Sequence, residues 1–143
     1  MIKVDEKMIH SKMVRIDRDV YIPKSYVKSI KPKNKKHLLF ILSPNAKFAR
    51  FVPCSEEVTK IRLLMLGVAP KFLRKMEEIY FHSGIKPLHT SASNSEITPL
   101  VYESYIDNQN LDAISFDDLI NRLEHLPGVT EVITETLNAA KYS

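Results

Sequence analysis

The order of six hydrophobic segments in the second half of the chain constrains the fold more than any other feature of the sequence. Two segments have apolar residues at helical spacing: residues 71–83, and the segment between Ser115 and Pro127. Four shorter segments predict strands over residues 61–66, 86–92, 98–106 and 129–137, the last of them rich in β-branched residues. The order β-α-β-β-α-β predicts an α+β, ferredoxin-like domain, in which two helices cover one face of a four-stranded antiparallel sheet.

Local signals mark the ends of the two predicted helices. Gly84 stands at the expected C-cap of the first helix. Ser115 is a good N-cap for the second, Asp118 completes a capping box, and Ile114 and Leu119 are spaced as a hydrophobic staple. The buried stripe of this second helix is predicted to consist of Phe116, Leu119, Ile120 and Leu123.

The first half of the chain is predicted to be a small β-rich module. Residues 13–22 alternate apolar and polar side chains, which predicts a strand with a bend at Arg18 and Asp19. Pro23 ends this strand and favours one helical turn over residues 25–30. Two further strands are predicted over residues 37–42 and 47–52, and the junction over residues 53–57. We therefore expect two domains, 1–55 and 56–143.

The charge of the chain is distributed unevenly between these halves. Residues 1–55 hold 13 Lys and Arg against 4 Asp and Glu, whereas residues 56–143 hold 8 against 13. A segment with a balance of +9 is a plausible surface for a polyanion such as nucleic acid. A solvated lysine-rich face is the alternative explanation of the same charge.

The sequence contains none of the familiar catalytic or cofactor motifs. It has no glycine-rich phosphate loop, its five histidines have no metal-ligand spacing, and Cys54 is the one cysteine. We expect no enzyme activity, no cofactor and no metal site. The longest apolar run is too short to span a bilayer and the first residues lack the apolar core of a secretory signal, so we expect a soluble, cytoplasmic protein.

Residues 14–42 (VRIDRDVYIPKSYVKSIKPKNKKHLLFIL) resemble the AbrB/MazE-type swapped-hairpin DNA-binding domain, through the Ile22-Pro23 pair and the basic loop at residues 31–34. In that family the hairpins of two chains interleave into one β-barrel. The resemblance implies binding of double-stranded DNA by a homodimer. The residues expected to face the groove are Lys12, Arg15 and Arg18, and those expected to contact the DNA backbone are Lys24, Lys28, Lys31 and Lys33.

Residues 69–93 (APKFLRKMEEIYFHSGIKPLHTSAS) and 117–135 (DDLINRLEHLPGVTEVITE) resemble the ACT domain, a regulatory module of amino-acid metabolism. The resemblance implies dimerisation and an effector site near the loop between the first strand and helix. An amino acid and another small anion are equally plausible effectors, because a helix N-terminus favours negative charge. The candidate effector residues are Gly67, Val68, Ala69, Pro70, Lys71 and His89.

Together these patterns predict a DNA-binding transcriptional regulator, a homodimer or higher homo-oligomer, whose ACT-like domain senses a ligand or assembles the protein. The alternative is a regulatory or scaffold subunit of a metabolic enzyme that does not bind DNA. An antitoxin-like protein is disfavoured, because the C-terminal half is patterned as a folded domain and not as a disordered tail.

Overall fold

A computed structural model describes residues 13, 15, 17, 19, 21–30, 33–67, 71–93 and 100–138 of the chain. Contacts between residues divide the chain into two compact units, Met1–Lys35 and Lys36–Ser143. The division lies before the predicted strands at residues 37–42 and 47–52, whereas the sequence placed the domain boundary after them.

Among the described residues of the first unit is a short helix, α1 (Lys24–Ser29), which agrees with the helical turn predicted over residues 25–30. Pro23 is its N-cap, in an extended conformation, as expected for a proline that precedes a helix. Among the described residues between 13 and 22, none is in a strand. The structure therefore does not show the swapped-hairpin barrel.

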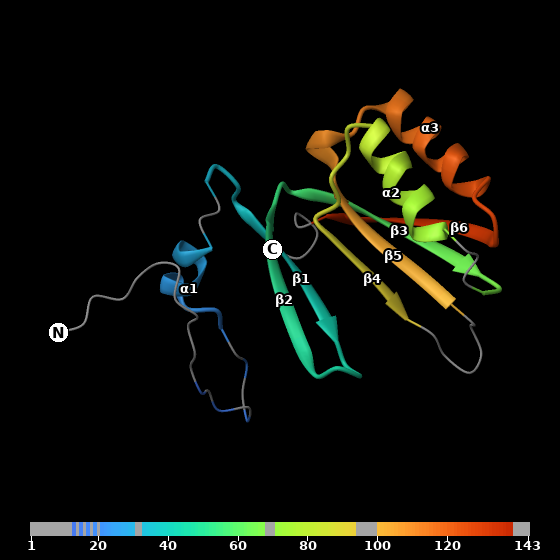
Figure 1. Cartoon of the computed structure of the whole chain (residues 1–143). Helices are drawn as coiled ribbons and strands as arrows, with labels where there is room; N and C mark the ends of the chain where they lie inside the picture. The colour runs from blue at the N-terminus through green and yellow to red at the C-terminus, as the bar shows by residue number, and fades with distance from the viewer. Residues whose placement is uncertain are drawn as a thin grey trace. The chain divides into compact units, whose positions relative to one another are not determined.

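The second unit contains the predicted β-α-β-β-α-β order. The elements are β3 (Glu57–Met65), α2 (Phe72–His82), β4 (His89–Ser93), β5 (Leu100–Asp107), α3 (Ala113–Glu124) and β6 (Val129–Asn138). The strands are ordered β4-β5-β3-β6 and every neighbouring pair is antiparallel. Helices α2 and α3 lie on one face of this sheet (Figure 1). The arrangement is α+β and is compatible with a ferredoxin-like domain.

The main core lies between this sheet and the two helices. Ile61 and Ile106 of adjacent strands are completely buried, as are Leu119 and Leu123 of α3. Phe116 and Ile120 pack against the same cluster, so the predicted stripe of α3 is confirmed. The ring of Phe72 on α2 meets that of Tyr102 edge-to-face, with 6.0 Å between centroids.

A separate hairpin precedes the four-stranded sheet. Strands β1 (His37–Ser43) and β2 (Phe48–Cys54) are antiparallel and form a two-stranded sheet of their own. Leu39 and Cys54 of the hairpin are buried in one cluster with Val58 and Tyr105 of the larger sheet. The main core and helices α2 and α3 lie on one face of the four-stranded sheet. Because Val58 and Tyr105 point to the opposite face, the hairpin covers part of the face that the helices leave open.

Several predicted element boundaries were wrong. Strand β3 begins at Glu57 rather than at residue 61, and β2 continues to Cys54, so both strands extend into the junction predicted over residues 53–57. Helix α3 begins at Ala113, before the predicted N-cap Ser115, because the N–H of Phe116 already donates to the carbonyl of Asp112 at 2.9 Å. Strand β4 begins at His89 rather than at residue 86, since Pro87 has no N–H for a strand ladder.

Candidate functional site

Two of the predicted DNA-binding residues are exposed lysines of α1. Lys24 and Lys28 are one helical turn apart and both are exposed. Tyr26, Val27 and Ile30 are half-buried, so the lysines occupy the solvent side of this helix. Its first turn contains no acidic residue. Two positive charges therefore project from one face of α1.

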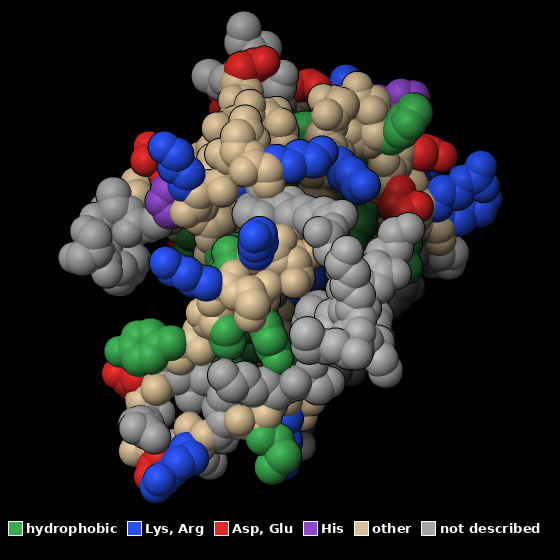
Figure 2. All heavy atoms as spheres, turned by 90° about the vertical axis from the view of Figure 1, so that its left-hand side faces the viewer, with side chains coloured by type: hydrophobic (Ala, Val, Ile, Leu, Met, Phe, Trp, Pro, Cys, Tyr) green, Lys and Arg blue, Asp and Glu red, His purple; other side chains and the backbone are tan. Residues whose placement is uncertain are grey.

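The other predicted DNA contacts are placed less uniformly. Lys33 is exposed and has a left-handed backbone with φ of 56°. Arg15 forms an exposed ion pair with Asp17, which offsets part of its charge. Lys12, Arg18 and Lys31 lie outside the described residues. Figure 2 shows several Lys and Arg side chains and several exposed hydrophobic side chains on the face that it presents.

The predicted effector residues do not come together. Gly67 follows β3, and Lys71 is the N-cap of α2, where its left-handed backbone has φ of 65° and its side chain makes no capping bond. His89 pairs with Tyr105, which pairs with Lys60 near the start of β3. Lys60 and Met65 are five positions apart on β3, so their Cα atoms are about 17 Å apart at the usual strand rise. Val68, Ala69 and Pro70 lie outside the described residues.

His89 instead meets an arginine from the hairpin. Arg50 on β2 is hydrogen-bonded to Nδ1 of His89, with 2.7 Å between the two nitrogens. A guanidinium only donates, so this Nδ1 accepts and the ring proton is on Nε2. Burial lowers the pKa of His89, and the charge of Arg50 lowers it further. The neutral ring therefore keeps one N–H donor for another group.

This pair stands at the side of an open groove of 710 Å³. The walls come from β2, from the second half of α2, from the loop that leads into β4 and from β5. Its apolar lining includes Met76, Tyr80, Ile85, Leu88 and Tyr102, and its charged side chains are Arg50, Glu77 and Lys86. Arg50 was not among the site residues predicted from the sequence. Its position could have indicated a role, because it is a charged side chain between Phe48 and Val52 on an otherwise apolar face of the strand.

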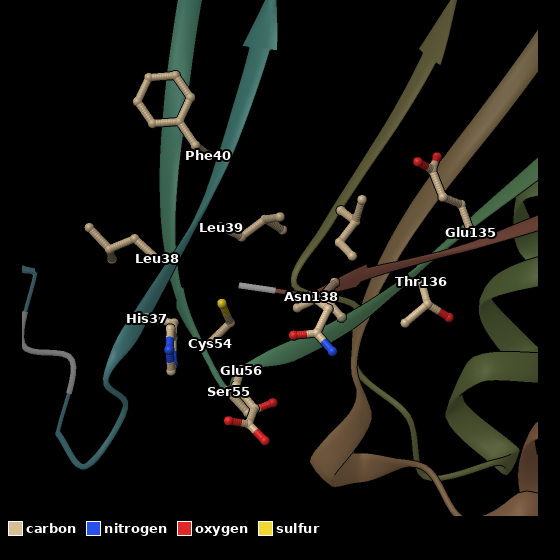
Figure 3. Close-up of a pocket in the computed structure, with 12 residues that line it drawn as sticks. His37, Leu38, Leu39, Phe40, Cys54, Ser55, Glu56, Glu135, Thr136 and Asn138 are labelled. Atoms are coloured by element: carbon tan, nitrogen blue, oxygen red, sulfur yellow. The ribbon is translucent and has the colours of Figure 1, made fainter. Parts of the chain in front are cut away.

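A second, smaller cavity of 270 Å³ lies between the hairpin and the end of β6. Figure 3 shows Leu39 pointing towards the sheet, while Leu38 and Phe40 point to the opposite side of the hairpin. Cys54, which is 3% exposed, lines this cavity and belongs to the apolar cluster of Leu39, Val58 and Tyr105. Cys54 is therefore a packing residue of the hairpin.

The outward face of the hairpin is entirely apolar. Residues paired across the two strands share a face, and the outward pairs are Leu38 with Pro53, Phe40 with Phe51 and Leu42 with Ala49. The rings of Phe40 and Phe51 are 4.7 Å apart, yet Phe40 is 56% exposed and Leu42 is 63% exposed. Such a patch is typical of a surface that contacts another protein chain.

The open face of the larger sheet carries charge rather than a continuous apolar surface. Glu103 on β5 forms ion pairs with Lys60 at 3.2 Å and with Arg62 at 3.6 Å. Lys60 also lies 5.4 Å from the centroid of the Tyr105 ring. These ion pairs occupy the middle of the face beside the hairpin.

In the part of the chain that the structure describes, no three His, Cys, Asp or Glu side chains are grouped as metal ligands. No helix among the described residues is long and apolar enough to cross a membrane.

Comparison with known proteins gives a distant structural likeness. No family model and no curated protein sequence matches the chain. The structure is similar to that of the C-terminal domain of the MgtC protein from Mycobacterium tuberculosis, with a TM-score of 0.45 and 12% identity. The alignment covers 61% of this chain and 94% of that domain.

Proposed function

We propose that this protein is a homodimeric DNA-binding regulator of transcription in the cytoplasm. Its N-terminal part would be a swapped-hairpin barrel and its ferredoxin-like part an ACT-like domain for assembly or for sensing an amino acid or small anion. The observation that carries the proposal is the pair of exposed lysines on α1, Lys24 and Lys28, within a strongly basic segment. Lysines spaced by one helical turn can contact adjacent phosphates of a duplex.

The apolar outer face of the hairpin supports the dimeric part of this proposal. DNA-binding proteins of this size commonly present two copies of their reading surface to one duplex. A second chain that packed on Phe40 and Leu42 would remove both side chains from water. The proposal therefore gives separate roles to the two surface types, the lysines for DNA and the hairpin face for assembly.

The test is fluorescence anisotropy of a labelled 30-base-pair duplex titrated with the full chain at several salt concentrations. We expect binding that weakens with salt, and a double variant, Lys24→Glu with Lys28→Glu, that loses most of it. Replacing each phosphate-contacting lysine lowers the slope of log K against log salt by about one. The matched control is Lys71→Glu with Lys75→Glu. It changes two lysines at the same spacing, at the N-cap and in the first turn of α2, and should bind DNA like the parent. Equal loss in both double variants, or no binding at low salt, would refute DNA binding through α1.

A second candidate function is that of a regulatory subunit which senses a metabolite without binding DNA. The observation that favours it is the groove at Arg50 and His89, which lies in the ferredoxin-like unit and is independent of α1. A chain that fails the DNA test but binds a ligand in this groove would support this alternative.

A further inference from the structure

The groove beside β4 has the composition of a small-molecule site. Its volume of 710 Å³ is within the range of ligand pockets, and its walls are mostly apolar with a few polar groups at one side. All of its lining residues belong to the second unit. It is also separate from the Gly67 and Lys71 end of the sheet, where the ACT resemblance implied an effector.

The polar groups of the groove favour an anion. Arg50 and Lys86 are cationic and Glu77 is anionic, while His89 is held neutral by its bond to Arg50. Within the described residues, neither Arg50 nor Lys86 forms an ion pair with a carboxylate. One N–H of Arg50 donates to Nδ1 of His89. The other N–H groups of the guanidinium and the Nε2–H of His89 can then donate to the same ligand. A carboxylate is the group that such adjacent donors recognise best.

Tyr80 lines the groove with a side chain that is only 4% exposed. Burial raises the pKa of Tyr80 to about 12, against a smaller lowering effect of a hydrogen bond with the Ser104 side chain, so its hydroxyl stays protonated. Tyr80 therefore adds aromatic surface and no charge to the groove, whose charge comes from Arg50, Lys86 and Glu77.

We propose that this groove binds a small organic carboxylate whose apolar or aromatic body lies against Met76, Tyr80 and Tyr102. The carboxylate is held at the rim by Arg50, with the Nε2–H of His89 and the ammonium of Lys86 as further donors. The site joins the hairpin to the ferredoxin-like domain, since Arg50 comes from β2 and the other two groups come from the segment that begins β4. A bound carboxylate therefore contacts both parts of the second unit.

The test is an NMR titration of the isotopically labelled full chain with sodium benzoate, which combines a carboxylate with an aromatic body. Benzamide is the neutral probe of the same shape, and acetate is the carboxylate without the body. We expect benzoate to shift the amide signals of His89, Thr90 and the second half of α2. It should bind at least about tenfold more tightly than benzamide, which loses the charged hydrogen bonds, and than acetate, which has no aromatic ring to bury. Equal binding of benzoate and benzamide would overturn the charge recognition.

Variants locate the site. Arg50→Gln should weaken benzoate about tenfold or more, and Lys86→Gln, in an exposed loop, should weaken it to a smaller extent. Arg74→Gln is the control. It removes a cation from α2, the helix that lines the groove, at a position that does not line the groove itself. Circular dichroism establishes that each variant is folded, and if Arg50→Gln does not fold, the Lys86→Gln result decides. Unchanged affinity in the folded Arg50 and Lys86 variants, or shifts that map elsewhere, would refute the site. The outcome is independent of the DNA titration, so the two proposals fail separately.

Discussion

The carboxylate of Asp107, at the end of β5, accepts a hydrogen bond from the backbone N–H of Ser55 at 2.9 Å, across 52 positions of sequence. The same carboxylate accepts from the hydroxyl of Ser55 and from the N–H of Gln109. Asp107 is 1% exposed. One buried side chain thus fixes the link between the hairpin and β3 to the end of β5, which pairs with the start of β3.

Replacing Asp107 by Ala is expected to destabilise the protein by about 2 kcal/mol or more, because buried N–H and O–H groups then lose their acceptor. Urea denaturation followed by circular dichroism measures this change. Glu131→Gln, which changes an exposed carboxylate of β6, serves as the control and should remain within about 0.5 kcal/mol of the parent. A similar small effect of Asp107→Ala would show that these hydrogen bonds do not hold the link.

Leu119→Ala tests the predicted packing of α3. Leu119 is completely buried, so the variant loses its transfer free energy and leaves a cavity, a combined cost of about 2–5 kcal/mol. Leu73→Ala on α2 removes the same atoms from a side chain that is 52% exposed and should cost much less. Denaturation curves of the two variants give the comparison, and equal losses would contradict the assigned face of α3.

The ferredoxin-like half was predictable because its signals are local and repeated. Leu119 and Leu123 lie four positions apart in a polar segment, and this spacing alone places them on one buried face. The start of α3 was missed because Asp112 and Ser115 are both good N-cap residues, and the choice depends on backbone bonds that the sequence does not contain.

The candidate sites were harder to predict because they depend on contacts between distant segments. Arg50 and His89 are 39 positions apart, and their contact requires the hairpin to lie beside β4. Lys71 and His89 are closer in sequence, yet strand register places them near opposite ends of the sheet. The hydrophobic pattern predicted the order of the strands and helices, whereas the distances between side chains required the topology.

Lys47→Gly is expected to stabilise the hairpin. Lys47 has φ of 56° in the turn before β2, and its N–H donates to the carbonyl of Pro44 at 3.2 Å. This left-handed conformation strains a residue with a Cβ, and glycine removes the strain at some cost in entropy, so the net gain is up to about 1 kcal/mol. Thermal denaturation measures it. Lys47→Ala keeps the Cβ and should show no such gain, and an equal gain from both changes would assign the effect to the lysine charge.

His89 is expected to make the protein less stable in mild acid. Its pKa is lowered from 6.5 in the folded protein, chiefly by burial and further by Arg50. The unfolded chain then takes up the proton at a higher pH than the folded protein does, so stability falls as the pH drops below about 7 towards the lowered pKa. His89→Gln should reduce the fall in the free energy of unfolding between about pH 7.5 and 5.5. Arg50→Gln removes the charge that adds to the effect of burial on the pKa of His89. This variant should therefore show a loss of stability with falling pH between those of the parent and of His89→Gln. A steeper fall in His89→Gln would reverse the sign of this argument.

The apolar outer face of the hairpin is expected to hold two copies of the chain together. Phe40 and Leu42 are more than half exposed, and the side chains that share their face carry no charge. A surface of this kind can pack on its own copy around a two-fold axis, because it needs no complementary charge. The double variant Phe40→Ser with Leu42→Ser should therefore shift the mass measured by light scattering from dimer to monomer, while circular dichroism shows that the sheet is retained. Leu73→Ser removes another exposed apolar side chain, on α2, and should leave the mass unchanged. A parent chain that is a folded monomer at micromolar concentration would remove self-association from the proposed mechanism. A double variant that remains a dimer would place the dimer contact on another surface.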